Sequence, residues 1–552
     1  MKSDIEIIRE NKKDRIVEIL NKLNINNENE YDLYGKYIAK INSNLIQDRN
    51  KKRNLILVTA ITPTKAGEGK TTTSISLVDG LNALGKEVIG CLREPSMGPV
   101  FGLKGGACGG GYAQVTPMED INLHFTGDFH AITSAVNLIS AVIDNHIYQG
   151  NELNIDENNI VWKRCLDTND RTLRDITIGQ GKATNGIERQ DHFVITVATE
   201  LMAILCLCKD IKDFKEKIKN ILVAYTKDGK EVFLKDLKIE GSVCALMKNA
   251  LNPNLVQTLE HTPVLIHGGP FANIAHGCNS LIATNLGLKL CDYVVTEAGF
   301  ASDLGAEKFF DIKCRLGNLK PKCVVLVATI RALKMHGGVT FEDLNNENLE
   351  ALSTGLANLK GHIDNVKNFG ITPIVNINKF NSDTDKEIEL IENYLKENNI
   401  EFSLNTAFTD GSKGSIDLAN KVVAACEKEN NFHFMYDLSL SIKEKIEKLN
   451  KEIYGGSSVE YSDLALSKLK EYSKYDNLPV CMAKTPSSFS DDPKLLNRPT
   501  GFTLHIRDLS LSLGAGFIVV YTGSVLTMPG LPKSPAALKI DVDEQGNING
   551  IS

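Results

Sequence analysis

Short, unbroken apolar runs separated by helical or loop segments constrain the fold of this chain more than any other feature. Each run is four to eight residues long and rich in Val, Ile and Leu. Strands without a polar side occur in parallel sheets that helices cover on both faces. The runs are Leu55–Thr62, Glu87–Leu92, Val264–His267, Tyr293–Glu297, Cys323–Ala328, Ile371–Ile377 and Phe517–Tyr521. The sequence therefore predicts the α/β class, with a parallel sheet flanked by helices and additional smaller α/β domains.

The chain has 552 residues, more than one hydrophobic core usually organises, because domains cluster near ~100–150 residues. Lys and Arg total 62 against 69 Asp and Glu, which gives a formal charge of −7. Since nucleic-acid binding depends on a basic excess, we expect no nucleic-acid partner. The opening MKSDIEIIRENKKDR is charged throughout, and no uninterrupted apolar stretch reaches about 18 residues. We therefore expect a cytoplasmic protein that does not associate with membranes.

Shifts in composition predict two main units. Residues 1–380 hold most of the apolar runs and form the predicted core, and the more polar stretch around 163–260 indicates an inserted subdomain. Residues 381–552 begin with the charged helical segment DTDKEIELIENYLKENN and form a predicted C-terminal α/β domain. Within the first fifty residues, IEIIRE, DRIVEILNKLNI and YGKYIAKIN space their apolar residues three and four apart, which predicts amphipathic helices.

A glycine-punctuated loop joins the first apolar run to a predicted helix from about Lys70 to Leu84. The loop and the helix start read Thr64, Lys65, Ala66, Gly67, Glu68, Gly69, Lys70, Thr71 and Thr72. In phosphate-binding loops, glycines let backbone N–H groups turn inward, a lysine neutralises phosphate oxygens and a hydroxyl ligates magnesium. Lys70 and Thr71 fit the last two roles, so we predict a P-loop-like ATP site with Mg²⁺ near Thr71. Thr64 stands where the G-x-x-x-x-G-K-[ST] pattern has glycine, and a turn that only starts a helix is the alternative.

The segment from Arg93 to His130 is rich in glycine, and its length indicates a functional loop. Arg93 follows a predicted strand, at the end where open α/β sheets bind ligands. Its guanidinium can hold a carboxylate or phosphate through two parallel N–H bonds, and a structural salt bridge is the alternative. His124 and His130 fit acid/base roles and structural hydrogen bonding equally well.

Two more glycine-rich segments follow predicted strands, HGGPFAN from His267 and EAGF from Glu297. Each alone is compatible with an ordinary turn, but several such strand ends together indicate one site. The triplet Asn378-Lys379-Phe380 is similar to part of the guanine-reading motif of GTPases. Because Asn381 occupies its fourth position, guanine specificity is not supported.

Long blocks of this sequence, in order, resemble the formate–tetrahydrofolate ligase family. The blocks are TPTKAGEGKTTT, LREPSMGPVFGLKGGACGGGYAQVTPMEDINLHFTGDFHAI, HGGPFANIAHGCNS, VVTEAGFASDLGAEKFFDIKCR, MAKTPSSFSDDPKLLNRPTGF and MPGLPKSPAA. The resemblance covers nearly the whole chain. It implies an ATP-dependent ligase of one-carbon metabolism that joins formate to tetrahydrofolate through formyl phosphate, giving 10-formyltetrahydrofolate, ADP and phosphate. It also implies Mg²⁺, a monovalent cation such as K⁺ or NH₄⁺, and a homotetramer.

The resemblance also implies roles for single residues. Lys70 would steady the transferred phosphoryl group, and Arg93 would hold formate and then formyl phosphate. Ala272 and Phe300 would form an apolar wall around the formyl group. Phe380 and Phe408 would stack on the pterin ring, Phe408 standing where many members have tryptophan. Without the resemblance, simple core packing would be the better interpretation of both phenylalanines.

Two other functions fit parts of the sequence. A P-loop ATPase switch uses an AGEGKTT-like loop to change partner binding, but such proteins are usually much shorter. A catalytically inactive relative would serve as a structural subunit, but the chain retains Lys70, Arg93 and Phe300. Dependence of ATP hydrolysis on formate and tetrahydrofolate separates the ligase from the switch.

Overall fold

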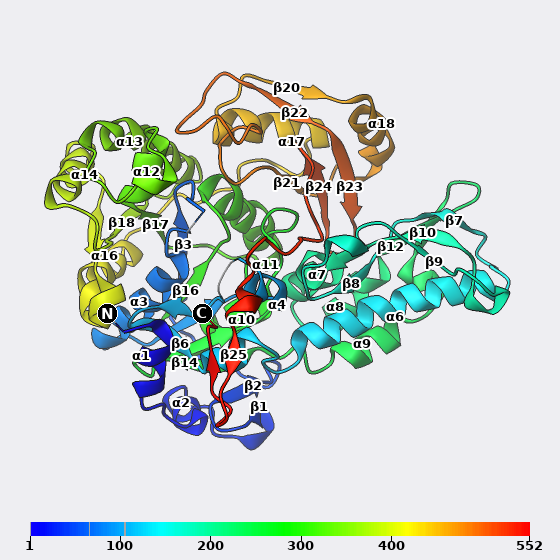
Figure 1. Cartoon of the computed structure of the whole chain (residues 1–552), viewed down its shortest axis with the longest axis horizontal. Coiled ribbons are helices and arrows are strands. Elements are labelled where there is room, and N and C mark those ends of the chain that lie inside the picture. Colours follow the sequence, from blue (N-terminus) through cyan, green and yellow to red (C-terminus); the bar gives the residue numbers. More distant parts are fainter. Residues whose placement is uncertain (1, 66, 104–105, 552) are drawn as a thin grey trace.

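A large, mostly parallel sheet forms the centre of the molecule (Figure 1). The computed structural model describes residues 2–65, 67–103 and 106–551. In spatial order, the main path of the sheet runs β1 (Tyr31–Tyr34), β2 (Ile38–Ile41), β14 (Asn254–Thr258), β15 (Pro263–Ile266), β4 (Val88–Leu92), β16 (Tyr293–Glu297), β3 (Asn54–Ala60), β17 (Cys323–Ala328), β18 (Ile374–Asn378) and β19 (Phe402–Asn405). Every neighbouring pair from β15 to β19 is parallel. The predicted α/β class is confirmed.

Both faces of the sheet are apolar and covered by helices. In β3, Ile56 and Val58 pack against α3 (Lys70–Ala83) and α16 (Ile416–Cys426). Leu55 and Leu57 belong to another cluster, which includes side chains of α10 (Leu281–Leu290) and α13 (Leu349–Asn368). Because side chains of a strand alternate between faces, a strand with no polar face must be buried on both sides.

The N-terminal region contains two helices and a hairpin. α1 (Asp4–Glu10) and α2 (Ile16–Lys22) confirm the first two predicted helices. The third prediction was wrong, because YGKYIAKIN forms the turn of the hairpin and strand β2, which pairs with β1 and β14. Gly35 has a φ of +72° in that turn. The buried Nζ of Lys40 lies 2.7 Å from Asp128 Oδ1, so tertiary contacts outweigh the helical spacing.

Between β6 (Ala113–Thr116) and β14 the chain leaves the sheet and builds a region around α6 (Asp128–Tyr148), at the right in Figure 1. Its other main elements are β7 (Ile155–Ile160), β8 (Arg164–Leu166), β9 (Ile176–Ile178), β10 (Arg189–Asp191), β11 (Phe193–Ile195), α7 (Glu200–Leu207), α8 (Ile211–Lys219), β12 (Leu222–Thr226), β13 (Glu231–Phe233) and α9 (Glu240–Met247). Their strands form small sheets apart from the central one. The predicted inserted subdomain around 163–260 falls largely in this region, and its limits stay a prediction.

Among the described residues, the C-terminal region forms three small sheets of its own, two of them at the top of Figure 1. Its elements are α17 (Ile442–Leu449), β20 (Ser458–Tyr461), α18 (Asp463–Glu471), β21 (Val480–Ala483), β22 (Thr503–Ile506), β23 (Asp508–Ser512) and β24 (Phe517–Tyr521), followed by the hairpin β25 (Asp541–Val542) and β26 (Ile548–Asn549). β24 pairs with β21 and β23, so this apolar run lies outside the central sheet. The division at residue 380 stays a prediction, and β19 of the central sheet lies beyond it.

The Gly-rich segment from Arg93 to His130 is not one open loop. It contains α4 (Met97–Phe101), β5 (Gly109–Gly110), β6 (Ala113–Thr116) and α5 (Met118–Asn122), and β6 pairs with β14. Helices α12 (Ile330–His336), α14 (Asp385–Glu397) and α15 (Ala407–Asp410) complete the elements near the sheet. Within the described ranges, no helix has the length and apolar character needed to cross a membrane.

Candidate functional site

The carboxyl ends of the parallel strands place most of the predicted site residues along one edge of the sheet. In spatial order, β4 leads to Arg93, β16 to Glu297 and Phe300, β3 to the glycine loop (residues 61–69), β17 to Thr329, β18 to Phe380 and β19 to Phe408. Ligands of open α/β sheets bind at this edge. The order places Arg93 beside the loop on one side and the two phenylalanines beyond it on the other.

The glycine loop turns sharply before α3. Gly67 and Gly69 have φ values of +81° and +74°, a left-handed conformation that favours glycine. An ideal Cβ at Gly69 would lie 2.5 Å from the side-chain nitrogen of Asn378. Lys70 begins α3, Lys65 is exposed, and Thr71 and Thr72 are half-buried. Ala66 lies outside the described residues.

Glu68 fixes the loop from within, a role that the sequence did not reveal. Its buried carboxylate accepts a hydrogen bond from the backbone N–H of Thr64 at 2.6 Å and another from the hydroxyl of Thr329. The side-chain amide of Asn378 donates to the Glu68 carbonyl at 3.2 Å. The ends of β17 and β18 therefore hold the loop, together with a bond inside the loop itself, as a preorganised anion site requires.

Glu297 joins the glycine loop to Arg93. The hydroxyl of Thr71 donates to Glu297 Oε2 at 2.9 Å, and Nη2 of Arg93 lies 3.6 Å from Oε1. The Glu297 side chain is 2% exposed and that of Arg93 is 27% exposed. Nε of Arg93 has no hydrogen-bond partner among the described residues. Arg93 thus forms the salt bridge that the sequence left as the alternative to a ligand role, and its side chain remains partly exposed beside Glu297.

Ala272 lies in a crowded corner beside Arg93. An ideal Cβ at Gly277 would lie 2.3 Å from the Ala272 Cβ, and one at Gly299 would lie 2.5 Å from it and 3.0 Å from Nη1 of Arg93. Phe300, the next residue, has a φ of +59°, which is rare for a bulky side chain. Strained conformations of this kind concentrate at functional sites. The structure therefore brings Arg93, Ala272 and the Phe300 segment together.

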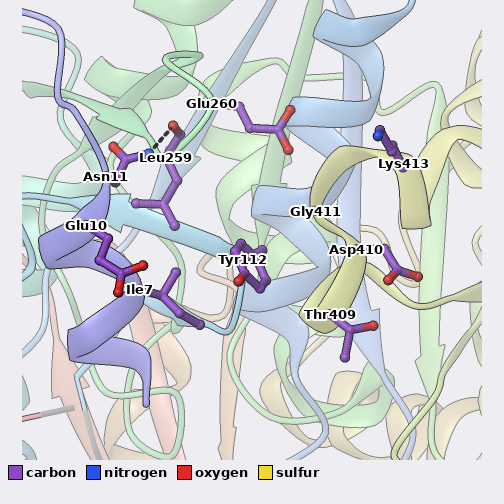
Figure 2. Close-up of a pocket in the computed structure, with 10 residues that line it drawn as sticks. All are labelled: Ile7, Glu10, Asn11, Tyr112, Leu259, Glu260, Thr409, Asp410, Gly411 and Lys413. Atoms are coloured by element: carbon purple, nitrogen blue, oxygen red, sulfur yellow. Dashed lines mark hydrogen bonds between the residues drawn. The ribbon is translucent and has the colours of Figure 1, made fainter. Parts of the chain in front are cut away.

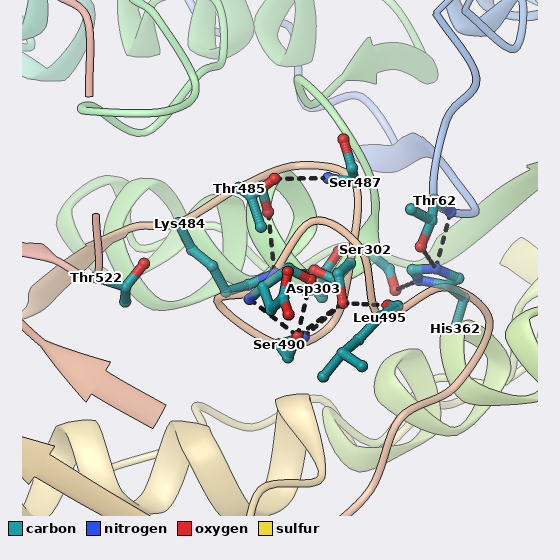
Figure 3. Close-up of polar contacts among 12 residues, drawn as sticks. Thr62, Ser302, Asp303, His362, Lys484, Thr485, Ser487, Ser490, Leu495 and Thr522 are labelled. Carbon is teal, nitrogen blue, oxygen red and sulfur yellow. Dashed lines mark hydrogen bonds and ion pairs between the residues drawn. The ribbon is translucent and has the colours of Figure 1, made fainter. Parts of the chain in front are cut away.

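A buried histidine connects the start of the glycine loop to the segment after Phe300 (Figure 3). The backbone N–H of Thr62 donates to Nε2 of His362 at 2.8 Å, and Nδ1 of His362 lies 2.7 Å from Ser302 Oγ. Because Nε2 accepts, the ring proton lies on Nδ1 and is donated to Ser302. Burial lowers the pKa of His362 well below its ordinary value, so the ring is neutral.

The C-terminal region contributes a buried lysine to the same area. Nζ of Lys484 lies 2.9 Å from Asp303 Oδ2, and both side chains are almost fully buried. Lys484 also donates to the carbonyl oxygens of Thr485 and Ser488. Figure 3 shows this cluster next to Ser302 and His362. The segment that carries Phe300 is therefore held from two sides, by His362 and by Lys484.

Phe380 and Phe408 follow the ends of the neighbouring parallel strands β18 and β19. The Arg331 guanidinium lies 3.9 Å from the centre of the Phe380 ring and covers one of its faces. Phe408 is 39% exposed, so it is not a core residue. No aromatic ring stacks on either phenylalanine within the described part of the chain. The rings share one edge of the sheet without touching.

His124 and His130 face each other. Nδ1 of His124 lies 2.9 Å from Nε2 of His130, and the rings stack at 5.1 Å between centroids. One imidazole must donate and the other accept. Neither contacts Arg93 or the glycine loop through a hydrogen bond among the described residues. The pair is thus a hydrogen-bonded unit of its own, and its part in acid/base chemistry stays a prediction.

Oxygen ligands near the loop suit magnesium better than a transition metal. Among the described residues, no group of three or more His, Cys, Asp and Glu side chains is placed to hold a metal ion. The Thr71 hydroxyl and the Glu297 carboxylate, 2.9 Å apart, offer two hard oxygens beside the loop. Mg²⁺ is commonly bound by one or two protein oxygens together with substrate phosphates and water.

The sequence also matches a known protein family. The family described as formate–tetrahydrofolate ligase matches residues 2–552, essentially the whole chain. Members of this family are ATP-dependent ligases that join formate to tetrahydrofolate in one-carbon metabolism. The match spans both the central sheet and the C-terminal region, so both parts of the chain are included in the family assignment. The chain therefore belongs to the formate–tetrahydrofolate ligase family and is an ATP-dependent ligase.

Proposed function

We propose that this ligase forms 10-formyltetrahydrofolate, ADP and phosphate through a formyl phosphate intermediate. The observation that carries the proposal is the contact of Glu297 with both Thr71 and Arg93, at 2.9 and 3.6 Å. Through Glu297, this contact supports the proposal that a carboxylate-binding arginine acts next to a phosphate-binding loop. Two anions, formate and the γ-phosphate of ATP, can meet only where cations and N–H donors offset their repulsion.

In the first step, an oxygen of formate attacks the γ-phosphorus of ATP, and the bond from phosphorus to the bridging oxygen breaks to release ADP. Backbone N–H groups of the glycine loop and Lys70 hold the phosphates, and Arg93 holds formate and then formyl phosphate. Catalysis of this step consists mainly of positioning and charge neutralisation. Thr64, Lys65, Ala66, Gly67, Glu68, Gly69, Thr71 and Thr72 complete the proposed ATP site.

Thr71 and Glu297 would hold Mg²⁺, which supplies positive charge to the phosphate oxygens when bound. Arg93 competes for the same carboxylate at 3.6 Å. Release of Glu297 from Arg93 on metal binding would leave the guanidinium available to formate. Glu297 would then affect both the proposed metal site and the proposed formate site.

In the second step, the N10 amine of tetrahydrofolate attacks the formyl carbon, the carbon–oxygen bond to phosphate breaks, and the amine proton is lost. Phe380 and Phe408 would hold the pterin ring between them, and Ala272 and Phe300 would limit the acid to one carbon. Burial of Ala272 at 5% exposure supports a wall without room for larger carboxylates. If acetate supported ADP formation as well as formate does, that steric role would be wrong.

Three further properties follow from family membership as proposals. A monovalent cation, K⁺ or NH₄⁺, would assist the reaction, the chain would form a homotetramer, and the protein would act in the cytoplasm. The partners would be the small molecules formate, ATP and tetrahydrofolate. Sedimentation and activity measurements with K⁺, NH₄⁺ or Na⁺ test the first two properties.

The central experiment measures ADP release with ATP and Mg²⁺ under four conditions: no addition, formate, tetrahydrofolate, and both substrates. We expect sustained release only with both, in step with formyltetrahydrofolate. With ¹⁸O-labelled formate, one labelled oxygen should appear in phosphate, because formyl phosphate transfers that oxygen. Lys70→Ala should remove most turnover. Unlabelled phosphate would exclude formyl phosphate, and ADP release indifferent to both substrates would favour an ATPase switch.

A further inference from the structure

The Phe408 ring rests on a strip of glycines that belongs to another part of the chain. An ideal Cβ at Gly111 would lie 2.8 Å from Cγ of Phe408, and one at Gly110 would lie 3.1 Å from Cε2. The backbone N–H of Tyr112 donates to the Phe408 carbonyl at 2.9 Å. The strip, Gly109–Gly111, therefore lies against Phe408 at Gly110 and Gly111, and a side chain at either of these two positions would press on the ring.

The first helix of the chain holds this glycine strip in place. The backbone N–H of Gly111 donates to Asp4 Oδ1 at 2.8 Å, across 107 positions of sequence. The side-chain amide of Gln114 donates to the Asp4 carbonyl at 3.0 Å and to the Gly111 carbonyl at 2.8 Å. An ideal Cβ at Gly110 would also lie 3.3 Å from Asp4 Oδ2. Asp4 thus contacts the strip at Gly110 and Gly111, the same two glycines that lie against Phe408.

The turn after Phe408 has a second attachment. The backbone N–H of Ser412 donates to Glu260 Oε1 at 2.7 Å. α1 and this turn both line a cavity of about 750 Å³. Figure 2 shows them on two sides of this cavity, with Tyr112 between them. The link from α1 to Phe408 therefore runs through the strip.

We propose that Asp4 is a positioning residue for the folate substrate. Its carboxylate fixes the peptide of Gly111, and the fixed strip sets the place of the Phe408 ring at the edge of the sheet. Hydrogen bonds to a charged acceptor are stronger than neutral ones, so a single carboxylate can hold a glycine-rich segment that would otherwise retain much conformational freedom. Asp4 need not touch tetrahydrofolate. This inference rests on the proposed folate role of Phe408.

The test compares Asp4→Ala, Asp4→Asn and Glu6→Ala with Phe408→Ala in the full-length protein. Asparagine keeps an oxygen that can accept from Gly111, whereas alanine removes it. Glu6 lies on the same helix and forms its capping box with Ser3, so Glu6→Ala weakens the helix without touching the strip. Steady-state kinetics give KM for tetrahydrofolate, ATP and formate, and thermal denaturation reports stability.

We expect Asp4→Ala to raise KM for tetrahydrofolate by about 3- to 10-fold, the size of the net contribution of one typical hydrogen bond. KM for ATP and formate should stay near wild type, Asp4→Asn should recover much of the loss, and Glu6→Ala should behave as wild type. Gly110→Ala gives an independent test if Asp4→Ala does not fold. Its added methyl should press on the ring and raise the same KM.

Three outcomes would overturn the inference. If Phe408→Ala weakens folate binding but neither Asp4→Ala nor Gly110→Ala does, the strip does not position the ring. If Asp4→Ala and Glu6→Ala change all three KM values and the melting temperature together, Asp4 has only a structural role. If Phe408→Ala itself leaves folate binding unchanged, the proposed role of Phe408 fails first, and the inference fails with it.

Discussion

Glu297 and Arg93 face each other at 3.6 Å across the boundary between strands β16 and β4. The carboxylate is buried, whereas the guanidinium reaches partly into solvent. A buried carboxylate with two partners constrains both of them, because neither can move away without leaving its charge or hydroxyl unmatched. The relationship makes Glu297 the most informative residue to change.

Glu297→Gln should lower turnover by about 10- to 100-fold, the usual effect of losing a charged group that supports a metal site. Glutamine keeps an oxygen for the Thr71 hydroxyl but lacks the charge that faces Arg93 and that would face the proposed Mg²⁺. Calorimetry of ATP binding with and without Mg²⁺ checks the cause, since the gain in affinity from Mg²⁺ should shrink in the variant. Glu87→Gln, at an exposed position before β4, is the matched control. An unchanged Mg²⁺ effect would remove Glu297 from the metal site.

Gly299→Ala should impair formate use selectively. The added methyl would lie 2.5 Å from the Ala272 Cβ and 3.0 Å from Nη1 of Arg93, so one of them must move. The backbone conformation at Gly299 is not left-handed, so alanine adds crowding without strain there. We expect KM for formate to rise by about tenfold or more, as about 1.4 kcal/mol of lost binding would give. An equal rise in KM for ATP would point to a general disturbance of the site.

Phe408→Ala should weaken tetrahydrofolate binding by about 1–3 kcal/mol, the range found when a stacking aromatic is removed. Because the ring is 39% exposed, the variant should lose little stability. Titration calorimetry with tetrahydrofolate measures the effect, and Phe341→Ala, at another exposed phenylalanine, is the control. Equal affinity in wild type and the Phe408 variant would exclude Phe408 from the site.

Asp79 predicts a pH dependence of stability. Burial raises the pKa of this α3 carboxyl from 3.8 to about 7, although hydrogen bonds from Thr258 and Thr262 oppose the rise. Between pH 4 and 7 the folded protein keeps the proton and the unfolded chain releases it. The free energy of unfolding should therefore fall as pH rises through this window.

Asp79→Asn has no proton to release, so its stability relative to wild type should increase from about pH 4 to about pH 7. Urea denaturation at several pH values measures the difference. Asp32→Asn, at an exposed position of β1, should follow the wild-type curve. Parallel curves for wild type and Asp79→Asn would show that the Asp79 carboxyl titrates alike in the folded and unfolded states.

The apolar runs predicted six strands of the central sheet, β3, β4, β15, β16, β17 and β18, because a strand without a polar side must be buried on both faces. They did not include β1, β2, β14 and β19, each of which contains polar residues. The same reasoning failed at Ile38–Ile41, where three apolar residues suit helical spacing but pair with β1 and β14. Phe517–Tyr521 was correctly predicted as a strand but belongs to a small C-terminal sheet. A local sequence pattern indicates that a strand forms, but contacts with residues far away in the sequence determine which sheet the strand joins.

Within the candidate site, the glycine loop and Arg93 were visible in the sequence because glycine spacing and strand ends have local signatures. The contacts of Glu68 with Thr329, of Glu297 with Thr71 and of His362 with Thr62 were not, because each joins residues more than two hundred positions apart. For Glu297, its position at the end of a predicted strand was the one available signal. No signal in the sequence indicated that Arg331 lies over Phe380, because the two residues do not belong to one motif.

The buried Lys484–Asp303 pair limits how far this protein can be shortened. Removing the chain from residue 484 onward would leave the Asp303 carboxylate alone in an apolar interior, three residues from Phe300. Loss of one partner of a buried ion pair typically costs about 3–5 kcal/mol, a large share of the stability of a domain. The segment from residue 484 onward is therefore not a detachable module, and we expect a minimal active version of this ligase to retain it.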